Sequence, residues 1–144
     1  MQELVLEPLA TSFAILRYPP QALPSWLVTH LQDSPKADGT RALLGITTTP
    51  EELSVVCDVN IAPKRLTEAS NVRVSRPWRA LKVQGPLEFE LTGILLRIAE
   101  PLADAGISIF AMSTFDTDYV LVKEERLEQA CRVLVATEFK VLGY

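Results

Sequence analysis

The chain has 144 residues, of which 48% are hydrophobic and 22% charged, with a formal net charge of −4. This length suits one compact domain or two small interdependent halves, and the apolar fraction is sufficient for a hydrophobic core. Because phosphate binding needs clustered Lys and Arg, and none is present, we expect no nucleic-acid partner. No apolar run approaches the roughly 18 residues of a membrane span, so we expect no membrane partner either.

The N-terminus and the cysteines indicate a cytoplasmic protein. The first residues include Glu3 and Glu7 but no early Lys or Arg, which is not the pattern of a secretory signal. Cys57 and Cys131, the two cysteines, each lie in an apolar segment. We therefore expect two reduced, buried thiols.

Few residues of the chain are suited to catalysis. His30 is the single histidine and lies on a short apolar segment, where a structural role is the usual one. The sequence has no Cys/His metal spacing, no nucleophile elbow and no phosphate-binding glycine loop. These observations favour a binding module without a cofactor, a metal or an enzymatic activity.

The N-terminal half is irregular, and eight of the ten prolines fall at or before Pro77. Runs rich in β-branched and aromatic residues predict strands over 12–18, 41–47, 53–57 and 71–74. Short helices are expected over 24–31 and 63–69, and 32–40 reads as a polar loop.

The C-terminal half has a clearer pattern. Strands are predicted over 78–83, 107–112, 119–122 and 139–143. A helix over 93–106 is expected to be capped by Thr92, ended by Gly106 and either kinked or loosened by one turn at Pro101. A second helix opens at Glu124-Glu125, and its buried stripe is predicted to be Leu127, Ala130, Cys131 and Leu134. The order strand, helix, strand, strand, helix, strand is the ferredoxin-like arrangement, a four-stranded antiparallel sheet with helices on one face.

The two halves share a short internal similarity. Residues 47–56 align with 113–122 at an offset of 66, which places Thr47 against Ser113 and Glu52 against Asp118. The alternative is that any β-hairpin has a polar tip followed by an apolar strand. The repeat predicts an α+β fold of two tandem ferredoxin-like units, an abbreviated one over 1–76 and a complete one over 77–144. Since residues 119–122 do not alternate with polar residues, we expect the second sheet face to be covered by the sibling half or a second chain.

Residues 78–135 resemble the C-terminal repeat of small tandem ACT-domain proteins, the amino-acid-sensing modules of aspartate kinase and related enzymes. They are also similar to the cytosolic arginine sensors of animal growth control. Residues 13–27 and 45–57 resemble the N-terminal repeat. The similarity rests on the glycine-marked loop 85–93 followed by a helix and on the Ser113, Thr114 and Asp118 element before a strand.

The resemblance implies a βαββαβ fold in each half and amino-acid binding at an interface between ACT units. The ligand would lie against the loop from Gly85 to Gly93. An α-amino acid offers a carboxylate, an ammonium group and a side chain, each of which needs a complementary group. Backbone N–H groups at Thr92-Gly93 suit the carboxylate, Asp118 suits a positive charge, and Ser113 and Thr114 can donate or accept hydrogen bonds. Leu87 and Phe89 can form an apolar wall.

Each of these residues also has a structural interpretation. Gly93 can simply begin a helix, Asp118 can accept N–H groups of a turn, and Leu87 and Phe89 can fill the core.

The predicted function is a non-catalytic amino-acid sensor that works through a homodimer or a protein partner. One alternative is a structural or protein-interaction module with a degenerate site. The other is an acyl-phosphate hydrolase using Arg79 or Arg97, for which no Arg-Asn phosphate cradle is visible. Whether Thr47 and Glu52 form a second site stays open.

Overall fold

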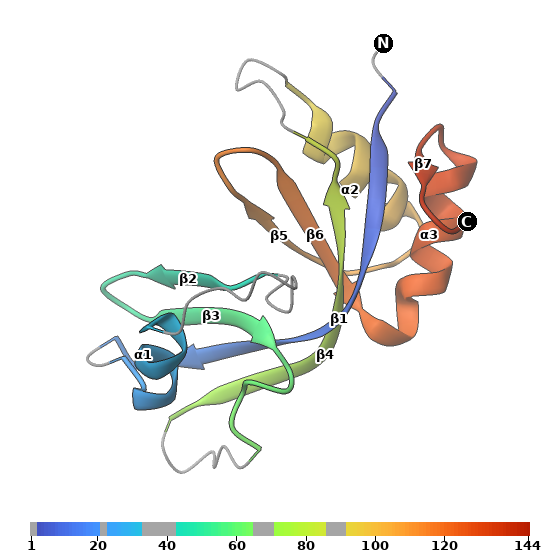
Figure 1. The fold of residues 1–144 in the computed structure, drawn as a ribbon. Coiled ribbons are helices and arrows are strands. Elements are labelled where there is room, and N and C mark those ends of the chain that lie inside the picture. Colours follow the sequence, from blue (N-terminus) through green and yellow to red (C-terminus); the bar gives the residue numbers. More distant parts are fainter. Residues whose placement is uncertain (1–2, 21–22, 33–42, 65–70, 86–91) are drawn as a thin grey trace. The chain divides into compact units, whose positions relative to one another are not determined.

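The computed structural model describes residues 3–20, 23–32, 43–64, 71–85 and 92–144. The expected polar loop 32–40 and most of the expected helix 63–69 lie outside these residues. Figure 1 shows the elements in chain order: β1 Val5–Tyr18, α1 Ser25–Gln32, β2 Gly45–Thr48, β3 Leu53–Asp58, β4 Arg73–Val83, α2 Ile94–Asp104, β5 Ile109–Ser113, β6 Asp118–Lys123, the 3₁₀ turn η2 Glu124–Arg126, α3 Leu127–Ala136 and β7 Lys140–Val141. Across the described part of the chain, no helix is both long and apolar enough to cross a membrane.

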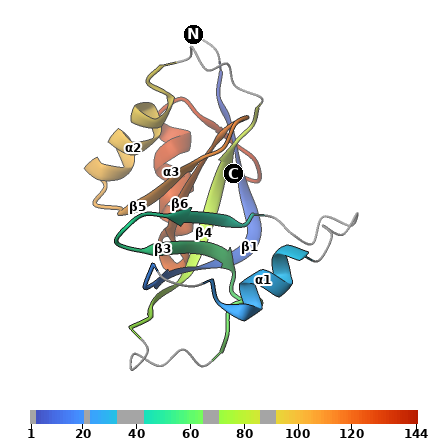
Figure 2. The same ribbon diagram turned by 90° about the vertical axis from the view of Figure 1, so that its left-hand side faces the viewer.

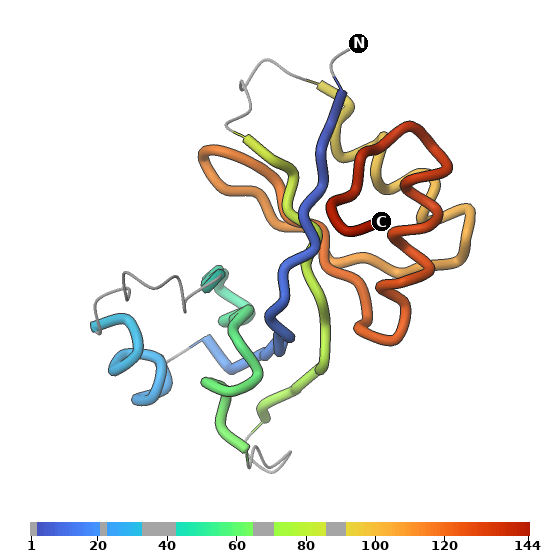
Figure 3. The backbone as a smooth tube through the Cα atoms, turned by 45° about the vertical axis from the view of Figure 1, so that its right-hand side comes forward, coloured from blue at the N-terminus to red at the C-terminus, as the bar shows by residue number. Residues whose placement is uncertain are grey.

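The chain divides into two compact units. Unit 1 contains Met1–Ser12 and Trp78–Tyr144, and unit 2 contains Phe13–Pro77. Strands β1 and β4 each pass from one unit into the other, as the chain trace in Figure 3 allows the reader to follow. The division after residue 77 lies beside the boundary expected after residue 76. The difference is that residues 1–12 belong with the C-terminal unit.

The sheet of unit 1 is built around β4. Strand β6 pairs antiparallel with β4, with Leu81 opposite Val120, and β5 pairs antiparallel with β6. On its other side β4 neighbours the first half of β1. The Gln84 N–H donates to the Val5 carbonyl at 2.9 Å, and the Arg79 guanidinium donates twice to the Leu9 carbonyl, at 2.7 and 3.0 Å.

The predicted ferredoxin-like α+β order is confirmed in unit 1 as β4, α2, β5, β6, α3 and β7, and only the last strand departs from the expected antiparallel pairing. Strand β7 is only two residues long and pairs parallel with the start of β1, with Val5 opposite Lys140. The first half of β1 occupies the place beside β4 that the C-terminal strand was expected to take. The physical reason is that a central strand must satisfy backbone groups on both edges, and residues 5–12 provide a longer partner than β7.

The core of unit 1 lies between its sheet and two helices. Figures 1 and 2 show α2 and α3 on the same face of this sheet. The predicted helical stripes are confirmed, because the buried residues are Ile94, Ile98 and Leu102 on α2 and Leu127, Ala130, Cys131 and Leu134 on α3. They pack in one cluster with strand residues such as Leu81 and Val120. Since apolar burial contributes roughly 25 cal/mol per Å², this cluster is a main source of stability in unit 1.

The residues that begin and end α2 and α3 agree in part with those predicted from the sequence. Gly106, at φ 71°, ends α2, and its N–H donates to the Ala103 carbonyl at 2.9 Å. Pro101 lies inside α2 as expected. The acidic pair Glu124 and Glu125 opens a 3₁₀ turn, and the α-helix itself begins at Leu127.

Both faces of the central strands are buried. Leu81 and Val120 point to the helices, whereas Ala80 and Leu121 alternate with them and point to the opposite face. All four side chains are fully buried. The unbroken apolar run at residues 119–122 indicated this burial on the second face.

Unit 2 has the same strand pattern around the second half of β1. Strand β3 pairs antiparallel with β1, with Leu16 opposite Val55, and β2 pairs antiparallel with β3. Leu27 of α1 is fully buried and packs in one cluster with Leu16 and Val55.

The two cysteines are free and buried, one in each unit. Burial is the main cause that raises the pKa of the Cys57 thiol from its ordinary value of 9.0 to about 11, with the neighbouring Asp58 charge adding to it. Burial likewise raises the pKa of Cys131. The folded chain thus favours the protonated thiols.

We expect the shift at Cys57 to make the fold less stable at high pH. Above pH 9 the unfolded chain releases the thiol proton while the folded chain retains it, so the free energy of unfolding falls until about pH 11. Relative to Cys57→Ala, the wild type should lose about 1 kcal/mol between pH 8 and pH 10. Urea denaturation at both pH values measures this difference. An unchanged difference would show that Cys57 titrates normally.

Candidate functional site

The β5–β6 hairpin positions three of the predicted site residues. Ser113 ends β5 opposite Asp118, which begins β6, so residues 114–117 form the turn. The Thr114 N–H donates to the Thr117 carbonyl at 2.8 Å, and the Thr117 N–H donates to the Thr114 hydroxyl oxygen at 3.2 Å. These bonds pair polar groups of the turn with one another, as Ser and Thr side chains commonly do in turns.

Asp118 binds the hydroxyl of Ser113. The Ser113 Oγ donates to Asp118 Oδ1 at 2.6 Å. Ser113 is exposed and Asp118 is half-buried. An ionised carboxylate accepts about four hydrogen bonds, so this contact orients Asp118 and leaves acceptor capacity for a donor from solvent or a ligand.

Thr117 connects this hairpin to the end of β4. Its side chain is 5% exposed, and its Oγ1 donates to the Val83 carbonyl at 2.5 Å. Gly85 follows Val83 by two residues, so Gly85 lies at the same end of the sheet as the hairpin turn. Sequence reasoning missed Thr117. The available signal was a hydroxyl residue between Asp116 and Asp118. The same pattern is typical of an ordinary turn, so it did not single out Thr117.

Gly93 begins α2, and its conformation explains the glycine. Gly93 is the N-cap residue at φ 77° and ψ 2°, a left-handed backbone that side chains disfavour. A Cβ at this position would meet no atom within 4 Å, so the backbone angle and not crowding requires glycine. Thr92 was expected to cap the helix and does not, because the cap position is Gly93 and no side chain caps the helix.

The predicted residues therefore fall into two groups. Gly85, Ser113, Thr114 and Asp118 lie at one end of the sheet of unit 1, whereas Thr92 and Gly93 lie at the start of α2. Among the described residues no hydrogen bond joins the second group to the hairpin. Leu87 and Phe89 belong to the segment 86–91, which lies outside the described residues.

Unit 2 has a hairpin, β2–β3, with the same pairing as β5–β6, but the residues that correspond differ from the predicted ones. In the β2–β3 hairpin Thr48 lies opposite Leu53, and in β5–β6 Ser113 lies opposite Asp118. The Thr49 N–H donates to the Glu52 carbonyl at 2.9 Å, as Thr114 does to Thr117.

The structural offset is therefore 65, and the offset of 66 is wrong. Asp118 corresponds to Leu53 and not to Glu52, and Ser113 corresponds to Thr48 and not to Thr47. A shift of one residue reverses which sheet face a strand residue occupies. The β2–β3 hairpin thus has no copy of the Ser113–Asp118 pair.

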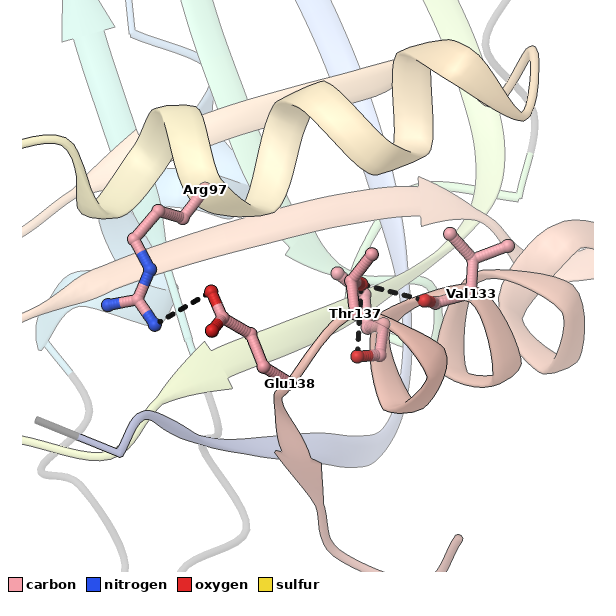
Figure 4. A network of polar contacts seen from close by, with 5 residues as sticks. Arg97, Val133, Thr137 and Glu138 are labelled. Carbon is pink, nitrogen blue, oxygen red and sulfur yellow. Dashed lines mark hydrogen bonds and ion pairs between the residues drawn. The ribbon is translucent and has the colours of Figure 1, made fainter. Parts of the chain in front are cut away.

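The two arginines considered for phosphate chemistry have structural contacts within unit 1. Arg79 binds the Leu9 carbonyl, as described above. Figure 4 shows Arg97 of α2 pointing toward Glu138, which it contacts at 3.4 Å. The Arg97 guanidinium also lies 5.5 Å from the ring centroid of Phe139, within cation–π range.

The contacts around Glu138 close the C-terminal end of α3. Glu138 has a positive φ of 93°, and the preceding Thr137 Oγ1 donates to the carbonyls of Val133 and Leu134 at 2.8 and 3.1 Å (Figure 4). These bonds satisfy carbonyl groups that the last helical turn leaves without intrahelical partners. Arg97 therefore holds this chain reversal against α2.

Comparison with known proteins agrees with the fold. Residues 73–136 match the family model of the ACT domain. These residues form an ACT domain. The crystal structure of protein Atu0741 from Agrobacterium tumefaciens is similar with a TM-score of 0.76 and 34% identity, covering 99% of this chain and 94% of that one.

Two further similarities are more limited. Residues of this chain are 43% identical over 58 positions to the human cytosolic arginine sensor for mTORC1 subunit 1, which is 40% of this chain and 18% of that protein. The chain thus spans about a fifth of the length of that sensor. The regulatory subunit of aspartate kinase from Thermus flavus is similar with a TM-score of 0.61 at 11% identity, covering 92% of this chain and 95% of that one. At this identity the likeness shows the fold alone.

We expect Thr117→Val to destabilise the ACT domain of unit 1. The substitution keeps the side-chain shape but removes the buried donor to the Val83 carbonyl, which should cost about 1–3 kcal/mol of unfolding free energy. Thr117→Ser retains the hydroxyl and is the matched control. Urea denaturation measures both. Equal stability of the valine and serine variants would show that the bond contributes nothing.

Proposed function

We propose that the chain is a non-catalytic regulatory module that binds an amino acid in unit 1. The ligand lies at the end of the sheet where Gly85 follows β4 and where Ser113 and Asp118 face each other. The observation that carries the proposal is the Asp118 carboxylate, which is oriented by Ser113 at 2.6 Å and remains half-buried at the edge of the sheet.

The chemistry at this end of the sheet suits a cationic group of the ligand. Asp118 offers acceptor sites for an ammonium or a guanidinium group, and a charge-assisted hydrogen bond contributes roughly 1.5–3 kcal/mol. Thr114 is exposed at the same turn, and its hydroxyl donates to the Thr117 carbonyl at 3.1 Å. The start of α2 presents N–H groups without a side-chain cap, which suit the carboxylate of the ligand.

The family and its relatives support a regulatory role. The matched human protein is named as a cytosolic arginine sensor. A regulatory output requires different ligand affinities in two states. The homodimer or partner protein, the location of the site at an interface between ACT units and the cytoplasmic localisation stay predictions.

A second candidate function is a structural or protein-interaction module. The favouring observation is Phe115 at the tip of the same hairpin, a large apolar side chain that is 78% exposed. This module would bind no amino acid.

A thermal-shift screen with the twenty amino acids tests the proposal. A ligand present at about 100 times its dissociation constant stabilises the folded chain by about 2.7 kcal/mol. We expect arginine or another amino acid to raise the melting temperature, and Asp118→Asn to remove this increase because it removes the charge and retains the shape. The matched control is Asp116→Asn, an exposed carboxylate in the same turn, which should leave the increase intact.

Two results would contradict the amino-acid site. The first is the absence of any shift with all twenty amino acids, which would favour the interaction module. The second is an equal loss of the shift in both asparagine variants, because this would point to a general loss of negative charge and not to recognition by Asp118.

A further inference from the structure

The turn of the β5–β6 hairpin in unit 1 carries an exposed aromatic side chain. Phe115 is 78% exposed and belongs to neither of the two hydrophobic clusters. The exposed Asp116 follows it in the same turn, and these two residues are called the hairpin tip below. Aromatic residues are enriched in protein interfaces relative to the rest of the surface, so the hairpin tip has the composition of an interface contact.

The fold of the turn does not require an aromatic residue. The β2–β3 turn of unit 2 closes in the same way, through the Thr49 N–H and the Glu52 carbonyl at 2.9 Å. At the structural offset of 65, Pro50 takes the position of Phe115. The same backbone closure thus forms without an aromatic side chain, and the presence of Phe115 needs another explanation.

Hydrogen bonds on both sides of the hairpin tip hold it in place. The Thr114 N–H and hydroxyl both donate to the Thr117 carbonyl, at 2.8 and 3.1 Å. The Thr117 hydroxyl in turn donates to the Val83 carbonyl of β4. A side chain on a turn that is already fixed loses less conformational freedom when it binds. The hairpin therefore presents Phe115 and Asp116 in an arrangement that is prepared for binding.

Unit 2 contains a cavity that can accept such a tip. Its volume is about 750 Å³, which lies within the range of roughly 300–1,000 Å³ that is common for binding pockets. The apolar part of its lining comes from Pro19, Pro20, Val72 and Val74. These side chains offer carbon atoms for contact with an aromatic ring.

The charged groups of the cavity lining are complementary to the hairpin tip. Arg17 and Arg73 are positive and Glu51 is negative, which gives a net charge of +1. Arg17 Nη2 donates to the backbone carbonyl of Glu51 at 3.2 Å, an uncharged acceptor, and within the described part of the chain no ion pair includes either arginine. Asp116 carries the opposite charge, and such complementarity favours association of the right partners.

The net charges of the two units identify a second copy of the chain as the partner. Unit 1 contains twelve acidic and seven basic residues, a net charge of −5, whereas unit 2 contains six acidic and seven basic residues, a net charge of +1. Two copies therefore attract each other through unit 1 of one copy and unit 2 of the other, and contact between two copies of unit 1 is unfavourable.

We infer that the hairpin tip of one copy of this chain docks into the cavity of unit 2 in a second copy. Phe115 lies against the prolines and valines of the cavity, and Asp116 binds the arginines of its lining. One hairpin tip is small compared with the roughly 1,200–2,000 Å² that a stable interface buries, so the association is weak and depends on protein concentration. The contact needs no bound amino acid and does not rest on the proposed function.

Sedimentation velocity of the full chain over a range of concentrations tests this contact. We expect Phe115→Ser to weaken self-association roughly tenfold or more, because it removes the aromatic anchor. The matched control is Leu96→Ser, since Leu96 is 64% exposed on α2 and lies outside the hairpin. A wild-type chain that stays monomeric at millimolar concentrations, or equal weakening in both variants, would overturn the inference.

A mixture of two defective variants tests whether the hairpin tip and the cavity meet. Arg73→Glu adds negative charge to the cavity lining and should weaken association, whereas Arg76→Glu is the matched control because Arg76 is exposed on the same strand and is not part of that lining. When the Phe115→Ser and Arg73→Glu chains are mixed, the intact tip of the second can dock into the intact cavity of the first. Fluorescently labelled Phe115→Ser chain should then sediment as a heterodimer. No recovery in the mixture would overturn the inference.

Self-association and amino-acid binding are separable by two variants. Asp118→Asn changes neither the hairpin tip nor the cavity, so it should associate like the wild type while it loses the thermal shift with the amino acid. Asp116→Asn should weaken association and retain that shift. The reverse effects on association would overturn the inference, because they would place the contact at Asp118 and not at the hairpin tip.

Discussion

The backbone hydrogen-bonding requirement of the central strands is the constraint on which the structure depends. A buried strand needs partners on both edges, and β1 and β4 meet this need by serving both units. The first half of β1 pairs beside β4 in unit 1, and its second half pairs with β3 in unit 2. Each unit thus includes residues that are distant in sequence, such as Leu9 and Arg79 in unit 1. Removal of the first twelve residues would take a strand from the C-terminal unit.

Strands β1 and β4 also contact the turns of the two hairpins, β5–β6 in unit 1 and β2–β3 in unit 2. In unit 1 the Thr117 hydroxyl joins the hairpin turn to the carbonyl at the end of β4. In unit 2 the Arg17 guanidinium near the end of β1 makes the comparable connection to the hairpin turn, through the Glu51 carbonyl. The same architecture therefore uses a neutral hydroxyl in one unit and a cation in the other. Unit 1 thus has the Asp118 carboxylate beside its hairpin turn, whereas unit 2 has the Arg17 guanidinium beside its hairpin turn.

The comparison of the two hairpins shows why a repeated fold does not imply a repeated site. The structural correspondence at an offset of 65 places Leu53 where unit 1 has Asp118. Leu53 is 2% exposed and belongs to the hydrophobic cluster of unit 2. An apolar residue at that position strengthens the core and cannot bind a cation. The backbone turn is retained because Thr49 and Thr114 close it in the same way, with bonds of 2.9 and 2.8 Å.

Local patterns were sufficient to predict most elements and the hairpin residues. The helical stripes of α2 and α3, the strands around residues 53–57 and 119–122, and the end of α2 at Gly106 follow from periodicity and from glycine at a left-handed position. The pairing of Ser113 with Asp118 was foreseeable in outline, because a short turn between two strands brings its flanking residues together. The repeat was detectable, but its register was not, since an error of one residue still matches hydroxyls with hydroxyls.

The sequence by itself determined the fold class, most helices and strands and the polar character of the β5–β6 hairpin, because these depend on residues near one another along the chain. It did not predict that β1 already begins at Val5 or that β4 is one continuous strand from Arg73 to Val83. Only the tertiary structure decided the membership of residues 1–12 in unit 1, the bond from Thr117 to Val83 and the contact of Arg17 with the Glu51 carbonyl. Each of these depends on pairing between segments that are between 34 and 70 residues apart in the chain, as in the Arg17–Glu51 and Arg79–Leu9 contacts. Such pairing is selected by burial and backbone hydrogen bonding over the whole sheet, and no local pattern encodes it.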